Sequence, residues 1–329
     1  MVDWSGHDGL GTSRRYRDMA QRQLHGISPC YELLCLGVAD DDEMLARLDT
    51  VAPPKRQPNL LLAAVRYLDG PIDDYPQFRT FVLSRWDDVA ALLQTRRTQT
   101  NEPRRCATLL PALAALPQPL ALLEVGASAG LCLHPDRFAY RYDDRPVLGA
   151  SSVVFDCRTS GPVPVPAALP SVVWRAGLDL NPLDVRSDDD VRWLSSLVWP
   201  EQTDRFATLR AAIEVARQDP VPVHRGDLLH DFVRLAKSAP TAATLVVFCS
   251  AVLAYLDVEQ RAQFRRDVAS VAAHRPTVEL TNEGPGVVVD LPTPAGAVPF
   301  VLARDGVPLA EASPHGEWLR WFDASPVGE

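Results

Sequence analysis

The chain is short of positive charge. Its 329 residues include 33 lysine and arginine residues against 42 aspartate and glutamate residues, a formal net charge of −9. Only two of the basic residues, Lys55 and Lys237, are lysine. A net negative field repels a phosphate backbone unless a local basic patch overrides it. The sequence therefore argues against nucleic acid as a partner.

Clustered cysteines and long apolar runs are also missing. The six cysteines, at positions 30, 35, 106, 132, 157 and 249, form no C-x-x-C pair, which argues against a zinc ribbon or a small disulfide framework. The N-terminus "MVDWSGHDGLGTSRRYRD" has charges and glycines where a signal peptide needs an apolar run. The most apolar segment elsewhere, "TLVVFCSAVLAYL", is too short to span a bilayer. These absences predict a cytoplasmic protein without a membrane partner.

Core-forming residues are plentiful. Hydrophobic residues make up 47% of the chain, and the length suffices for about two domains. In the first part, apolar residues recur at helical spacing, as in "QPNLLLAAVRYLDG" and "WDDVAALLQTRRT". We predict a helical N-terminal domain over residues 1–115 that acts as a lid on the substrate side.

From residue 116 onward, short apolar runs alternate with helical patterns. The runs are "LALLEVG", "SVVWRAGLDLNP", "VPVHRGDLL", "TLVVFCSAVL" and "TVELTNEG". This alternation predicts an α/β domain over residues 116–329, with a Rossmann-like, mostly parallel sheet. Residues from about 136 to 170 fit no helix and are predicted to be an insertion of loops and short strands. Asp305-Gly306, between two apolar runs, predicts an antiparallel hairpin, which we expect at the edge of the sheet.

The first predicted strand runs into a loop of small residues, "EVGASAG". A dinucleotide loop, G-x-G-x-x-G, would need glycine at 126, 128 and 131, where the chain has Gly126, Ser128 and Leu131. The looser acid-x-G-x-G-x-G pattern of S-adenosylmethionine enzymes fits better, with Ser128 in place of the middle glycine. A helix starting after the loop would add unpaired N–H groups. The alternative is a turn whose small residues serve helix–sheet packing alone.

If the loop binds a cofactor, we expect its main chain, which carries only small side chains, to form the floor of a nucleoside pocket. Glu124 is placed to balance the ammonium group of S-adenosylmethionine, and acids after later strands are placed to bind ribose and adenine. The candidate cofactor-binding residues are Glu124, Gly126, Ala127, Ser128, Gly130, Asp179, Leu180, Asn181, Asp227, Leu228 and Ser250. The turn around Asp179 and a helix cap at Asp227 are equally ordinary uses of these two acids.

Candidates for the acceptor side flank the sheet. Asn101 and Arg105 precede the first strand and are candidate substrate-binding residues, although a solvated helix start is equally natural there. Glu102, Tyr255 and Glu283 are the candidate catalytic bases. Cys249 is expected to be a small buried residue, and His315, near two tryptophans, a structural histidine. No metal-binding motif is present.

Several strings together resemble an uncharacterised bacterial family, domain of unknown function 2332. They include "RQPNLLLAAVRYL", "TQTNEPRRCATLLP", "LEVGASAGLCL", "GLDLNPLDV", "VVFCSAVLAYL" and "PHGEWLRWF", and they follow in order along nearly the whole chain. The resemblance implies a sheet of the methyltransferase type. It also implies S-adenosylmethionine as the cofactor, since the nucleotide-binding half of the family looks like methyltransferases that use it.

The leading interpretation is therefore an S-adenosylmethionine-dependent methyltransferase acting on a small molecule. A non-catalytic binder of S-adenosylmethionine or a related nucleoside, serving as a sensor or scaffold, is the alternative. An NAD(P)-dependent oxidoreductase is disfavoured by the missing G-x-G-x-x-G. The sequence carries no indication of the methyl acceptor or the oligomeric state.

Overall fold

The computed structural model describes residues 11–99, 101–284, 286–287 and 299–323. The chain divides into two compact units. The helical unit comprises the described residues of 3–100 and 187–207, and the sheet unit those of 101–186 and 208–329. In the described part of the chain, no helix is both long and apolar enough to cross a membrane.

The helical unit is built from short capped helices. The side chain of Ser28 accepts a hydrogen bond from the Tyr31 N–H at the start of α2, and Asp74 accepts one from Gln77 at the start of α5. Its helices are α1 (Thr12–Met19), a π-helical turn (Ala20–Leu24), α2 (Pro29–Ala39), α3 (Asp42–Leu48), η2 (Pro53–Lys55), α4 (Pro58–Tyr67), α5 (Tyr75–Ser84), α6 (Trp86–Thr95) and α8 (Asp188–Ser196). The helical spacing read from this part of the sequence is confirmed.

The boundary predicted at residue 115 differs from the division that the structure has. Helix α7 (Arg105–Ala114) belongs to the sheet unit, because its buried residues enter the core beneath the strands. Helix α8 belongs to the helical unit. There Trp193 donates to the Arg97 carbonyl (3.0 Å), and the Arg96 guanidinium lies 5.7 Å from the Trp193 ring centroid.

The described strands of the sheet unit form one ten-stranded sheet in the order β2-β3-β10-β9-β8-β7-β6-β1-β4-β5. They are β1 (Leu120–Val125), β2 (Ala139–Tyr142), β3 (Val154–Ser160), β4 (Val172–Asp179), β5 (Val223–Arg225), β6 (Thr244–Ser250), β7 (Thr277–Glu283), β8 (Phe300–Arg304), β9 (Val307–Ala312) and β10 (Trp318–Trp321). Strands β5, β4, β1, β6 and β7 run parallel. Antiparallel pairs join β7 to β8, β8 to β9 and β9 to β10. A mostly parallel α/β sheet with antiparallel C-terminal strands is thus confirmed.

One detail of the predicted sheet is corrected, and another is confirmed. The Asp305-Gly306 turn does join an antiparallel hairpin, with both residues at positive φ. The hairpin, however, lies inside the sheet, because β10 continues it and pairs in parallel with β3. The predicted insertion of loops and short strands is confirmed, and its strands β2 and β3 extend the sheet to one edge.

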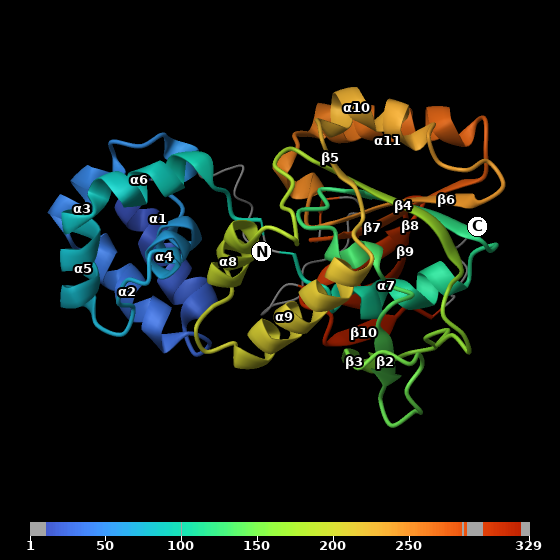
Figure 1. The fold of residues 1–329 in the computed structure, drawn as a ribbon, viewed down its shortest axis with the longest axis horizontal. Helices are drawn as coiled ribbons and strands as arrows, with labels where there is room; N and C mark the ends of the chain where they lie inside the picture. The colour runs from blue at the N-terminus through green and yellow to red at the C-terminus, as the bar shows by residue number, and fades with distance from the viewer. Residues whose placement is uncertain (1–10, 100, 285, 288–298, 324–329) are drawn as a thin grey trace. The chain divides into compact units, whose positions relative to one another are not determined.

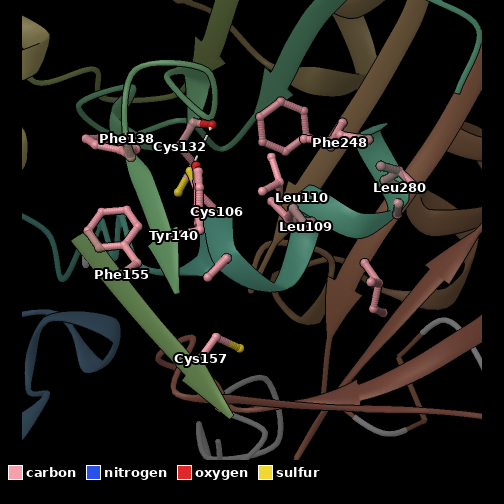
Figure 2. Packing of buried hydrophobic residues seen from close by; sticks show 14 of the residues in the cluster. Cys106, Leu109, Leu110, Cys132, Phe138, Tyr140, Phe155, Cys157, Phe248 and Leu280 are labelled. Carbon is pink, nitrogen blue, oxygen red and sulfur yellow. Dashed lines mark hydrogen bonds between the residues drawn. The ribbon is translucent and has the colours of Figure 1, made fainter. Parts of the chain in front are cut away.

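Helices cover both faces of this sheet (Figure 1). Helices α10 (Leu228–Ala236) and α11 (Val258–Ala272) lie together over one face, and α7 lies on the other. Helix α9 (Thr203–Gln218) begins in the helical unit, and its buried Ala212 joins the core on the α7 side. Figure 2 shows Leu109 and Leu110 of α7 against Phe248 and Leu280 of the central strands. Because each central strand is buried on both faces, it reads as an almost continuous apolar run.

Candidate functional site

The candidate site lies at the carboxyl end of β1, where the strand order reverses. From β1 the chain later adds β4 and β5 on one side and β6 and β7 on the other. In open α/β sheets, ligands bind beyond the carboxyl ends of the strands at such a point. Side chains alternate between the faces of a strand, and Leu122 and Phe248 face α7. Glu124, Ser250 and Asn282 therefore project to the α7 side as well.

Two buried acceptor atoms stand out on this side. Glu124 is 3% exposed, and its Oε2 has no hydrogen-bond partner among the described residues. Asn282 is fully buried; its Nδ2 donates to the Ser250 hydroxyl (3.1 Å), while its Oδ1 has no partner in the described chain. Asn282 was not among the predicted site residues, although its string "TNE" ends a predicted strand. Buried polar atoms are nearly always hydrogen-bonded, and the described residues supply no donor to these two oxygens.

The pKa of Glu124 depends on its burial and on Arg105, a buried cation. Burial raises the pKa of Glu124 well above its usual value; the nearby Cys132 and Asp179 add to this, and Arg105 opposes it. Arg105 donates to the carbonyl of Pro314 (2.8 Å) and to that of Ser250 (3.1 Å). Because Ser250 is the last residue of β6, Arg105 lies at the carboxyl end of that strand. This is the edge of the sheet that contains the candidate site.

The small-residue loop after β1 is packed by its neighbours. Gly126 and Gly130 both have φ of 72°. A Cβ atom on Gly126 would lie 2.3 Å from Cγ2 of Val252, and one on Gly130 would lie 3.1 Å from Cγ2 of Val223. Valine side chains therefore pack closely against both glycines, as the packing interpretation of the loop expects.

The main-chain N–H groups of the loop are largely used within the protein. Those of Gly126 and Ala127 donate to the Leu178 carbonyl, and that of Gly130 to the Ala127 carbonyl. Asn101 Oδ1 accepts from the Leu131 N–H (2.9 Å). The expected helix after the loop is only one 3₁₀ turn, η3 (Leu131–Leu133). The loop thus lacks the row of free N–H groups that binds a phosphate.

The acids after β4 and β5 are both engaged. Asp179 accepts from the N–H groups of Ser128 (2.8 Å) and Asn181 (2.7 Å), so it ties the loop to its own strand end. Leu180 beside it is 59% exposed. Asp227 accepts from the Leu229 N–H and caps α10, which begins at Leu228. Asp227 Oδ1 also lies 3.6 Å from Nδ1 of His230. Asp179 lies on the same face of the sheet as Glu124.

Replacing Asp179 with alanine is expected to lower the free energy of unfolding by about 2 kcal/mol, because the buried Ser128 N–H loses its acceptor. Urea unfolding measures this effect. Asp184→Ala is the control, since Asp184 is an exposed acid in the same segment and its change should have little effect. Equal losses for the two variants would contradict the assigned role of Asp179.

The three predicted bases differ in their surroundings. Glu102 is buried, and its Oε2 lies 3.9 Å from Nδ1 of His315, so His315 has a partner that the sequence did not reveal. Tyr255, in η4 (Leu253–Tyr255), is 58% exposed. Glu283 projects to the α11 side of the sheet, and its Oε1 accepts from the N–H groups of Val252 and Leu253. Tyr255 and Glu283 are neighbours, while Glu102 lies beside His315.

Comparison with known proteins identifies a family whose description names no activity. Residues 13–321 match the family described as "Uncharacterized protein conserved in bacteria (DUF2332)". Among curated proteins, none matches the chain.

Proposed function

Because the chain belongs to this DUF2332 family, whose description assigns no activity, we propose a function from the site itself. The protein is an S-adenosylmethionine-dependent methyltransferase acting on a small molecule. The order of β5, β4, β1, β6 and β7 supports this proposal, since it is the 3-2-1-4-5 order of doubly wound nucleotide-binding sheets. The proposal includes the type of the ten-stranded sheet, which we assign to the methyltransferases.

The observation that carries the proposal is the pair of free acceptors at the strand-order reversal. Glu124 Oε2 and Asn282 Oδ1 are buried and unpartnered among the described residues. Such atoms cost about 1–3 kcal/mol each unless a donor reaches them. A ligand with an ammonium group and amino donors meets that need, and S-adenosylmethionine has both. A carboxylate at Glu124 would also balance its positive charge.

The loop amides favour this cofactor over a dinucleotide. A pyrophosphate needs several unpaired N–H groups at a helix start. The described loop uses its amides internally and leads into a single 3₁₀ turn. A cationic cofactor without phosphate makes no such demand.

The cofactor supplies an electrophilic methyl group, and the protein has to hold the acceptor in line with it. Arg105, fixed by two carbonyls, and Asn101, fixed by the Leu131 N–H, are the residues proposed to position the acceptor. Glu102 is the base that we propose for an acceptor that must lose a proton, because it is buried and has His315 beside it.

One observation favours the second candidate, a non-catalytic binder. Tyr255, one of the three predicted bases, is 58% exposed and so stands in solvent. A protein that binds a nucleoside only as a sensor needs no base. Both candidates bind S-adenosylmethionine, and only the methyltransferase transfers its methyl group.

Thermal denaturation with added ligands tests the proposal. S-adenosylmethionine and S-adenosylhomocysteine at about 100 times their dissociation constants should each stabilise the protein by about 2.7 kcal/mol, while NAD should leave it unchanged. Stabilisation by NAD alone would reject the methyltransferase and support an oxidoreductase. If the first two ligands stabilise, methylated product from a panel of small molecules distinguishes the enzyme from the binder.

A further inference from the structure

Strand β7 carries a second polar feature, on the face opposite to Asn282. Glu279, Thr281 and Glu283 follow one another at every second position, so their side chains project into the layer between the sheet and α11. They are 8%, 1% and 1% exposed. The layer also contains apolar side chains such as Phe264 and Val268 from α11.

Each of the three residues has a buried oxygen without a partner in the described chain: Glu279 Oε1, Thr281 Oγ1 and Glu283 Oε2. Buried polar atoms in native proteins are nearly always hydrogen-bonded, and ordered water serves where the protein does not. Side chains two residues apart on a strand are separated by about 6.6 Å. A water molecule with hydrogen bonds of about 2.8 Å on each side bridges most of that distance.

We propose that Glu279, Thr281 and Glu283 line a row of buried water molecules between β7 and α11, and that this row conducts protons along the strand. It runs from the carboxyl edge of the sheet, where Glu283 ends β7, toward Glu279 near the start of the strand. This inference goes beyond the proposed function and does not depend on any ligand.

The groups around the row suit proton exchange. Burial raises the pKa of Glu279, with Arg265 of α11 opposing and Asp305 of the β8–β9 turn adding to the shift. Burial also raises the pKa of Glu283, opposed by the Val252 and Leu253 N–H groups, Arg105 of α7 and the Cys249 thiol of β6. Tyr255 in η4 is a further titratable neighbour of Glu283. Carboxyls that keep a proton to higher pH can both donate and accept one.

The transfer conserves atoms and electron pairs. The Glu283 carboxyl gives its proton to the adjoining water and becomes a carboxylate. Each water, and the Thr281 hydroxyl between them, accepts one proton and passes another on. The Glu279 carboxylate, the most exposed of the three at 8%, takes up the last proton and exchanges it with solvent. No other bond forms or breaks.

A crystal structure of the full chain at high resolution tests the water row. Ordered water is expected within hydrogen-bonding distance of Thr281 Oγ1 and of both carboxyl groups. In Thr281→Val, which has nearly the same shape, the central water should be lost. An empty apolar void in the natural chain, or a metal ion in place of the water, would overturn the proposal.

Hydrogen–deuterium exchange of the Glu283 carboxyl, followed by the infrared band that Glu283→Gln removes, tests conduction. Thr281→Val should slow this exchange by about tenfold, roughly the factor for one lost hydrogen bond. Thr281→Ser should restore the rate. Thr277→Val changes a threonine on the same face of β7, whose hydroxyl donates to the Arg275 carbonyl, and should have no effect. Exchange in Thr281→Val as fast as in the natural chain would refute conduction through Thr281.

Discussion

Gly126→Ala is expected to lower the free energy of unfolding by about 3 kcal/mol or more. Two costs add at this position. An alanine at φ of 72° costs about 1 kcal/mol, because its Cβ crowds the following carbonyl in the left-handed region. Its Cβ would also lie 2.3 Å from Cγ2 of Val252, and overpacking of this kind costs about 1–3 kcal/mol. Urea unfolding of the two proteins measures the difference.

Two further variants separate these costs. Gly306 has φ of 78°, and a Cβ there would have no atom within 4 Å, so Gly306→Ala should show the conformational cost of about 1 kcal/mol alone. Adding Val252→Ala to Gly126→Ala should recover most of the steric cost, and the double-mutant cycle reports the coupling between the two sites. Equal losses for Gly126→Ala and Gly306→Ala would contradict the close packing of Val252 on the loop.

The central part of the sheet could be predicted because its strands are buried on both faces. Strand β1, "LALLEV", and strand β6, "TLVVFCS", are buried along their whole length and therefore stand out as apolar runs. The outer strands could not be placed in this way. In β3, buried and exposed residues alternate, and its partner β10 comes from a remote part of the chain. Such pairing depends on tertiary contacts that a local pattern does not contain.

The candidate site could be located from the sequence, but the uses of its residues could not. Glu124, Ser250 and Arg105 do lie at the carboxyl edge of the central strands, as the strand-end rule predicts. The sequence could not show that Val252 would pack on Gly126, because these residues are far apart in the chain. It could not show either that Asp179 would bind the Ser128 N–H, since that contact requires β4 to pair with β1.

The free carboxyl of Glu124 has a consequence for ligand binding. Burial raises its pKa, so the protein without ligand keeps the Glu124 proton to a higher pH than an exposed glutamate does. The folded state therefore binds this proton more tightly than the unfolded state, and the contribution of Glu124 to stability falls as pH rises through the folded pKa. A cation bound beside the carboxyl favours the carboxylate form, so its binding should release the proton.

Affinity for S-adenosylmethionine is accordingly expected to rise with pH by up to about tenfold per unit below the Glu124 pKa, and to level off above it. Glu124→Gln should bind about 100-fold more weakly, with affinity independent of pH, because a neutral amide gives the cation no countercharge. Titration calorimetry at a series of pH values from the usual glutamate range upward, in buffers of different ionisation enthalpy, measures both the affinity and the released proton. Glu279→Gln removes another buried glutamate of raised pKa, on the opposite face of the sheet, and should retain the full pH dependence. Proton release that disappears in Glu279→Gln but persists in Glu124→Gln would place the cation away from Glu124.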